Sequence, residues 1–128
     1  MYREYNPNPR GKSVGDCVIR AISKAMDISW DDAYMRLFAQ GYFLKDIATA
    51  NDVWGRFLID NGYKRRIIPD TCPDCYTIRE FASDHVKGTY ILGTGTHAVT
   101  VVDGDYYDSW DSGSEVPIYY FEKENQDG

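Results

Sequence analysis

The chain has 128 residues, of which 43% are hydrophobic, and this is enough for the core of a single domain. Its 20 acidic residues outnumber its 14 lysines and arginines, which gives a formal net charge of -6 at pH 7. Long-range attraction to phosphate backbones or anionic lipids is therefore not favoured, and we expect neither nucleic acid nor a membrane surface as a partner.

The sequence predicts a cytoplasmic location, which would be the host cytoplasm if the protein is viral. No apolar stretch approaches the roughly 20 residues that are needed to cross a bilayer. Residues 1–12 also lack the apolar core of a signal peptide.

The first predicted helix brings a cysteine to its N-terminus. Residues 1–15 include Asn6-Pro7-Asn8-Pro9, which interrupts regular structure, so we expect an extended or looped lead-in. Apolar residues then recur at spacings of three and four over residues 18–26, and Asp16 stands where an N-cap residue belongs. Cys17 is therefore predicted in the first helical turn.

Three further helices are predicted before residue 88. Gly41 and Asn61-Gly62 are the residues expected to end the second and third helices. The second and fourth helices are expected to begin at capping boxes, formed by Ser29 with Asp32 and by Thr77 with Glu80.

Cys72 and Cys75 lie between the third and fourth predicted helices. Three cysteines are an odd number and Cys17 is distant in sequence, so we expect reduced thiols rather than a disulfide framework. The spacing is half of a zinc site, with His85 as the only nearby third ligand, and a redox pair or a simple turn are the other interpretations. We expect no metal and no cofactor.

Short β-rich runs follow Gly88 and predict an antiparallel sheet. They cover residues 89–92, 97–102, 106–110 and 117–121, and the polar residues 122–128 are expected to be frayed. The only basic run, Lys64-Arg65-Arg66, is expected to form a solvated strand edge.

The order of the elements predicts an α+β fold of one domain, residues 1–128. A helical half, about 16–86, would pack against a C-terminal antiparallel β-sheet, about 88–121, and leave a cleft between them.

The dipeptide Asp103-Gly104 predicts a two-residue type I′ hairpin turn. If these residues form the loop, alternation places His97, Val99, Asp108 and Trp110 on one face. His97 and Asp108 are then diagonal neighbours, with backbones roughly 7 to 8 Å apart, and their side chains can form a hydrogen bond.

Cys17, His97 and Asp108 have the residue types of a thiol active site. A helix N-terminus stabilises a thiolate, an adjacent imidazolium stabilises it further, and a carboxylate orients the imidazole. The backbone amide of Cys17 can donate to a developing oxyanion. Arg20, one turn further on, either adds positive charge near the thiol or is a surface arginine.

Four segments contain these residues: Gly15-Asp16-Cys17-Val18-Ile19-Arg20-Ala21, His97-Ala98-Val99, Val102-Asp103-Gly104 and Asp108-Ser109-Trp110-Asp111. In their order and spacing they resemble the papain-like superfamily of cysteine peptidases, above all its small phage and bacterial members, which include the C39 bacteriocin-processing peptidases. The resemblance implies a papain-like fold and a catalytic triad of Cys17, His97 and Asp108. It also implies a peptide or protein as the substrate.

The sequence departs from this family at the second oxyanion donor. Papain-like and C39-type peptidases usually carry a glutamine several residues before the cysteine, whereas this chain has Arg10-Gly11-Lys12-Ser13 there. The candidates for the oxyanion site and the cleft are Asn6, Asn8, Asp16 and Trp110. The two asparagines adjoin prolines and can instead shape the lead-in, while Trp110 either shields the His97–Asp108 bond or belongs to the core.

The predicted function is that of a papain-like cysteine protease or a related thiol amide hydrolase, and acyl transfer to amines would use the same groups. The alternative is a catalytically inactive papain-fold binding module, such as a viral protein that captures a host protein or a ligand. In that case Cys17 would be an ordinary buried cysteine, His97 a half-buried strand histidine and Asp108 a turn cap.

Overall fold

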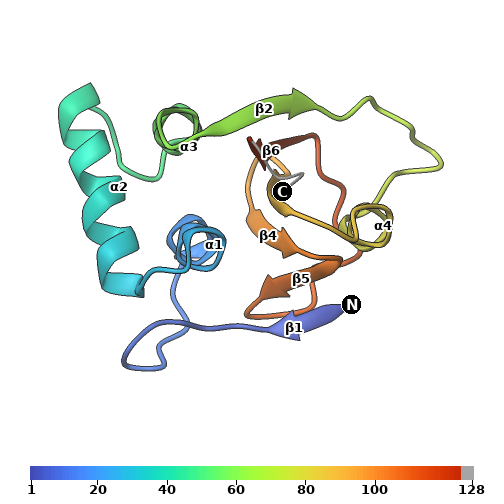
Figure 1. Ribbon diagram of the computed structural model, residues 1–128, viewed down its shortest axis with the longest axis horizontal. Coiled ribbons are helices and arrows are strands. Elements are labelled where there is room, and N and C mark those ends of the chain that lie inside the picture. The colour runs from blue at the N-terminus through green and yellow to red at the C-terminus, as the bar shows by residue number, and fades with distance from the viewer. Residues whose placement is uncertain (125–128) are drawn as a thin grey trace.

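A six-stranded mixed sheet forms the middle layer of the computed structural model, which describes residues 1–124 (Figure 1). The strands lie in the order β1-β5-β4-β3-β6-β2. Their bounds are Tyr2–Glu4 for β1, Tyr63–Ile67 for β2, Thr89–Gly93 for β3, Ala98–Val102 for β4, Asp105–Asp108 for β5 and Tyr119–Lys123 for β6.

The expectation of a purely antiparallel sheet is wrong at one edge. β1 comes from the expected lead-in and pairs in parallel with β5, with Tyr2 opposite Tyr106, whereas the other neighbouring strands are antiparallel. The short strand β1 forms backbone hydrogen bonds with the otherwise open edge of β5. The centre of its Tyr2 ring also lies 5.7 Å from the centre of the Tyr106 ring.

The opposite edge of the sheet is formed by β2, which contains the basic run 64–66, so the prediction of a strand edge for this run is confirmed. The expectation of a frayed tail is wrong for Glu122 and Lys123, which pair with β2. The rest of that expectation concerns mainly residues 125–128, which lie outside the described part of the chain.

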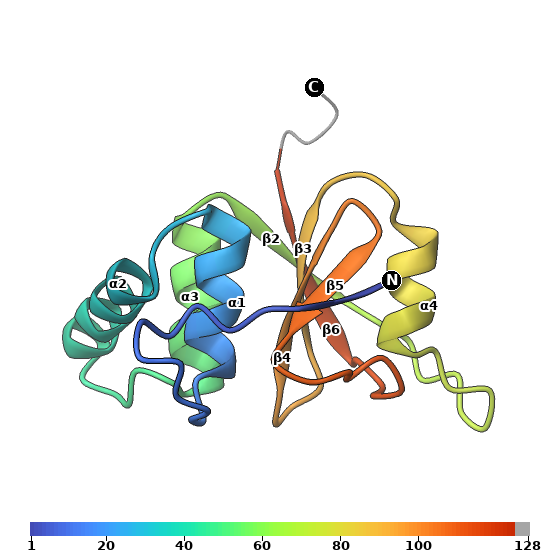
Figure 2. The same ribbon diagram turned by 90° about the horizontal axis from the view of Figure 1, so that it is seen from below.

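Helices cover both faces of the sheet (Figure 2). α1, α2 and α3 lie on one side and α4 on the other, so the division into a helical half and a sheet half is too simple. Among residues 1–124 no helix has both the length and the apolarity to cross a membrane. The helices are α1 Cys17–Met26, α2 Trp30–Leu44, α3 Asn51–Asp60 and α4 Ile78–Asp84.

The alternation of side chains along β3 divides the core in two. Ile91 belongs to the cluster beneath α1–α3, whereas its neighbours Tyr90 and Leu92 belong to the cluster beneath α4. This is the pattern of a strand with both faces buried. Residue 91 therefore supports the helical layer that carries Cys17.

Most helix boundaries follow the predicted signals. The Ser29 hydroxyl accepts the amide hydrogen of Asp32, and the capping box at the start of α4 is complete. The prediction that Gly41 ends the second helix is wrong, because α2 continues to Leu44. A Cβ atom at Gly41 would lie 2.9 Å from the Cα atom of Ala48, so this glycine permits close backbone packing.

The predicted hairpin turn is confirmed. Asp103 and Gly104 have φ angles of 49° and 88°, the left-handed values of a type I′ turn, and Val102 pairs with Asp105. Since His97 immediately precedes β4 and Asp108 ends β5, both residues lie at the same end of this hairpin.

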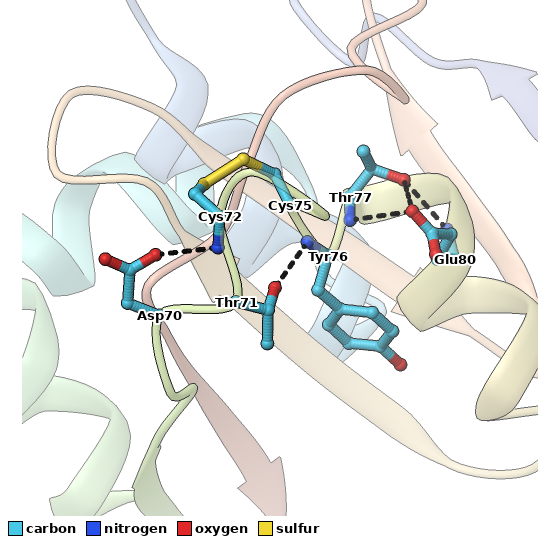
Figure 3. Close-up of a disulfide and its surroundings, with 7 residues drawn as sticks. All are labelled: Asp70, Thr71, Cys72, Cys75, Tyr76, Thr77 and Glu80. Atoms are coloured by element: carbon cyan, nitrogen blue, oxygen red, sulfur yellow. Dashed lines mark hydrogen bonds between the residues drawn. A yellow bond between two sulfur atoms is a disulfide. The ribbon is translucent and has the colours of Figure 1, made fainter.

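Cys72 and Cys75 form a disulfide, so the expectation of two reduced thiols is wrong (Figure 3). The Cys72 amide donates to the Asp70 carboxylate and the Tyr76 amide to the Thr71 hydroxyl, which folds the loop tightly. The two cysteine Cα atoms are consequently 4.2 Å apart. A disulfide presents no thiolate to zinc, and among residues 1–124 no group of three or more potential ligands surrounds it.

Candidate active site

Three elements that are far apart in sequence meet at one end of the β4–β5 hairpin. Cys17 is the first residue of α1 and is half-buried. His97 stands just before β4, and Asp108 is the last residue of β5. The structure thus brings together the three side chains that the sequence selected.

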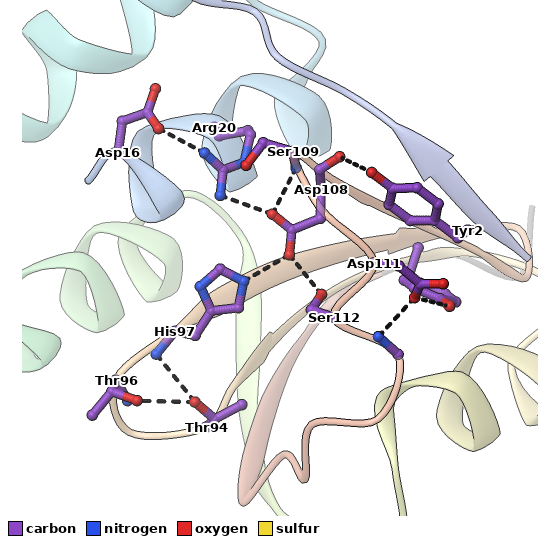
Figure 4. Close-up of polar contacts among 12 residues, drawn as sticks. Tyr2, Asp16, Arg20, Thr94, Thr96, His97, Asp108, Ser109, Asp111 and Ser112 are labelled. Atoms are coloured by element: carbon purple, nitrogen blue, oxygen red, sulfur yellow. Dashed lines mark hydrogen bonds and ion pairs between the residues drawn. The ribbon is translucent and has the colours of Figure 1, made fainter. Parts of the chain in front are cut away.

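The carboxylate of Asp108 holds the ring of His97. Nε2 of His97 lies 2.6 Å from Oδ2 of Asp108, so the predicted hydrogen bond is confirmed (Figure 4). Asp108 is completely buried, and it also accepts hydrogen bonds from Ser112 Oγ at 2.6 Å and from the Ser109 amide at 2.8 Å. The imidazole is therefore fixed by a carboxylate that is itself held in place.

The thiol of Cys17 and the imidazole of His97 line the same cavity. The imidazole lowers the pKa of Cys17 through hydrogen bonding and its positive charge. Because Nε2 is engaged by Asp108, Nδ1 is the ring nitrogen that remains for the sulfur. This order, sulfur to imidazole to carboxylate, is the arrangement needed for an activated thiol.

The electrostatics of the site favour a thiolate beside an imidazolium. Burial disfavours the thiolate, but the hydrogen bonds from His97 and Ala98 and the nearby positive charges outweigh it and lower the pKa of Cys17. Burial likewise disfavours the imidazolium, but the hydrogen bonds to Asp108 and Cys17 raise the pKa of His97 to about 9. Burial opposes ionisation of Asp108 too, yet His97, Ser112 and Arg20 lower its pKa.

Arg20 connects the site to the start of the helix. It is only 5% exposed, donating to Asp16 Oδ1 at 2.6 Å and to Asp108 Oδ1 at 2.8 Å (Figure 4). The surface interpretation of Arg20 is therefore wrong. Asp16 occupies the N-cap position without a side-chain cap, because its second oxygen accepts the indole hydrogen of Trp30 at 2.8 Å.

A cavity of about 190 Å³ opens beside the thiol. The start of α1, the start of α3 and the turn before β4 surround it, and the residues lining it are Gly15, Cys17, Val18, Thr49, Asn51, Trp54, Thr96, His97 and Ala98. Sequence reasoning missed Asn51, the one carboxamide in this lining, because nothing in the local pattern of α3 points toward Cys17. Its Oδ1 accepts the Trp54 indole hydrogen at 3.0 Å, and its Nδ2 donates to Gly95 at 3.2 Å.

The remaining sequence candidates have other positions. Asn6 donates to the Lys12 carbonyl and Asn8 accepts the Arg10 amide, so both asparagines shape the lead-in, and neither lines the cavity. Trp110 is 47% exposed, which contradicts its assignment to the core, and its ring centre lies 5.3 Å from that of His97. The two ring planes are inclined by 39°, so the indole lies beside the imidazole.

Neither a protein-family model nor a curated protein or solved structure matches this chain. The chemistry of the site is therefore argued from its own geometry.

Cys17 is expected to react with iodoacetamide at a lower pH than an ordinary thiol, whose pKa is about 8.5. The alkylation rate should rise through the lowered pKa of Cys17 and form a plateau below the His97 pKa of about 9, where the ion pair persists. In His97→Ala the thiolate loses its neighbour, so the rate near pH 6.5 should fall about tenfold or more. The pH profile of alkylation, read by mass spectrometry, measures this.

The same chain in urea, with its disulfide kept oxidised, supplies the matched control, since Cys17 is then the only free thiol in an unfolded environment. If the folded and unfolded chains give the same pH profile, the thiolate–imidazolium pair does not exist.

Replacing Arg20 should destabilise the fold strongly. Arg20→Met leaves Asp16 and Asp108 buried without their shared cation, and breaking a buried ion pair in this way costs about 3 to 5 kcal/mol. Urea unfolding of the variant measures the loss. Arg36→Met is the control, because Arg36 is exposed on α2 and should change stability by less than about 0.5 kcal/mol. An Arg20→Met loss below about 1 kcal/mol would contradict the assigned role.

Proposed function

We propose that this protein is a cysteine peptidase or a related thiol amide hydrolase of papain-like type, acting on a peptide or protein. Cys17 is the nucleophile, His97 the general base and acid, and Asp108 the residue that orients His97. The observation that carries the proposal is that Cys17, at the N-terminus of a helix, lines one cavity together with His97, whose ring is held by the buried Asp108. A helix N-terminus followed in the chain by a hairpin that supplies histidine and aspartate supports the papain-like assignment.

The reaction begins with the thiolate of Cys17 attacking the carbonyl carbon of the substrate. The imidazolium of His97 donates its Nδ1 proton to the leaving amine as the C–N bond breaks, which leaves a thioester on Cys17. A water molecule then gives a proton to His97 and attacks the thioester, and the C–S bond breaks to release a carboxylic acid and regenerate the thiolate. Asp108 remains ionised throughout and stabilises the imidazolium through Nε2.

Asn51 is the best-placed second donor for the oxyanion. The first turn of α1 has amide hydrogens without acceptors inside the helix, and that of Cys17 is one of them. Asn51 lines the same cavity, and its Oδ1 bond to Trp54 and Nδ2 bond to Gly95 fix the carboxamide while leaving one N–H of Nδ2 free to donate. Asn51 on α3 would thus provide the carboxamide donor that the lead-in lacks beside the cavity.

The second candidate function is a catalytically inactive papain-fold binding module. The observation that favours it is the position of Asn6 and Asn8, whose amides are used in the lead-in and do not line the cavity. Such a module would bind its ligand without forming a thioester, so acylation of Cys17 separates the two functions.

Hydrolysis is tested with p-nitrophenyl acetate and with pooled peptide anilides. The wild-type protein should release the chromophore and show the mass of an acyl group on the peptide that contains Cys17. Cys17→Ala should abolish both signals, while Asp108→Asn should lower kcat by about 10²- to 10⁴-fold, since the imidazole loses its orienting carboxylate. Arg36→Met should retain full activity. Turnover that survives in Cys17→Ala, or no acylation of the wild-type protein, would reject the hydrolase in favour of the binding module.

The role of Asn51 has its own test. Asn51→Asp keeps an oxygen to accept the Trp54 indole hydrogen but removes the N–H donor, and losing one oxyanion donor lowers kcat by about 10²- to 10³-fold. On the alkylation plateau, where Cys17 is fully ionised whatever the added carboxylate does to its pKa, the alkylation rate should stay within about twofold of wild type, because iodoacetamide forms no oxyanion. Equal losses of turnover and alkylation would instead show that Asn51 acts through the structure of the site.

A further inference from the structure

A second hollow, of about 450 Å³, runs along α3 away from the thiol. Its walls are the outer face of α3 and strands β6 and β2, and it is lined by Asn51, Asp52, Gly55, Arg56, Ile59, Arg65, Tyr119 and Phe121. Asn51 also lines the cavity beside Cys17. The two hollows therefore adjoin at the start of α3.

The floor of this groove leads directly to the candidate active site. The Tyr119 ring forms part of the floor, and its centre lies 6.0 Å from that of Trp54, which lines the Cys17 cavity. From Asn51 to Ile59 the helix advances eight residues, or about 12 Å at 1.5 Å per residue. An extended peptide rises about 3.3 Å per residue, so the groove has room for three to four residues.

Arg65 gives the groove a positive charge that forms no ion pair with any carboxylate of the described residues. In the basic run of β2, Arg66 forms an ion pair with Glu122, whereas Arg65 lies over the ring of Tyr119, 4.6 Å from its centre. No carboxylate within residues 1–124 forms an ion pair with Arg65. Its guanidinium is held above an aromatic ring with its donors available, a geometry suited to binding a carboxylate.

None of the other charged residues in the described lining of the groove forms an ion pair with Arg65. Arg56, on the facing helix, is bound to Asp60 at 3.2 Å, and both of these side chains are exposed. Among residues 1–124, Asp52 is the only acidic residue in the lining, and it lies near the active-site end. With Arg56 compensated by Asp60, the groove retains one cation, Arg65, and one carboxylate, Asp52, and these two form no ion pair with each other.

We propose that this groove along α3 binds the part of a peptide substrate next to the cleaved bond, and that Arg65 selects an acidic side chain in it. The cleavage of the bound peptide rests on the proposed function, but its binding does not. The apolar side chains of Tyr119, Phe121 and Ile59 accept the aliphatic part of a glutamate or aspartate side chain, while the guanidinium of Arg65 pairs with its carboxylate.

The test measures binding by the Cys17→Ala protein, which cannot cleave. The probes are pools of acetylated, amidated tetrapeptides that contain one Glu, one Gln or one Lys at matched positions, with retention read by mass spectrometry. The Glu pool should be retained at least about fivefold more than the Gln pool. With Arg65→Glu added, this preference should reverse toward the Lys pool. Arg36→Glu makes the same charge change on exposed α2 and should leave the preference intact.

The inference is overturned if the three pools bind equally, if none binds, or if Arg36→Glu alters selectivity as much as Arg65→Glu. Its failure is distinct from failure of the proposed function. A protein whose Cys17 forms no acyl-enzyme but which still prefers the Glu pool retains the groove as a binding site. An active hydrolase without this preference rejects only the role of Arg65.

Discussion

Both the fold and the candidate site depend on the hydrogen bonds that the buried carboxylate of Asp108 accepts. Each of its oxygens accepts two hydrogen bonds, Oδ1 from Arg20 and the Ser109 amide, and Oδ2 from His97 and Ser112. An ionised carboxylate has about four lone-pair sites, and all of them are used here. Burying a charge is costly unless it is paired and hydrogen-bonded, and this set of donors satisfies that condition.

Through Asp108, the helical layer and the sheet are tied together at the point where chemistry is proposed. Arg20 extends from the first turns of α1 to the end of β5, and Asp16 holds the other side of the guanidinium. Cys17, placed between Asp16 and Arg20 in sequence, therefore has its position relative to His97 set by this ion-pair network. The spacing between the proposed nucleophile and the proposed base therefore depends on how α1 is anchored.

Most of the site could be predicted because its signals are local. The two-residue turn at Asp103-Gly104 fixes the strand register, which places His97 and Asp108 on one face as diagonal neighbours. The apolar repeat that starts at Val18 places Cys17 at the start of a helix. Only the resemblance to papain-like peptidases predicted that these two segments lie together, because no local sequence pattern predicts contact between a helix N-terminus and a hairpin.

The features that sequence reasoning missed depend on contacts between distant segments. Asn51 acquires its position from Trp54 and from the turn before β4, and β1 forms only because β5 offers it an edge. The burial of Arg20 likewise requires Asp108, 88 residues away. Gly41 shows the same limit on prediction within a helix. A side chain at this position would clash with Ala48, and the sequence of α2 alone does not predict that contact.

The network also explains how the site can hold an ionised Cys17 in a partly buried position. Transfer of a proton from Cys17 to His97 leaves the total charge of the network unchanged, so no additional net charge has to be buried. The proton transfer places a positive imidazolium between two negative groups, the thiolate and Asp108. Arg20 donates to the other oxygen of Asp108 and forms an ion pair with Asp16. Without Arg20, Asp108 would be more easily protonated, and a neutral carboxylic acid would stabilise the imidazolium far less. The charge of Arg20 thus helps to keep Asp108 ionised, and through Asp108 it favours the thiolate form of Cys17.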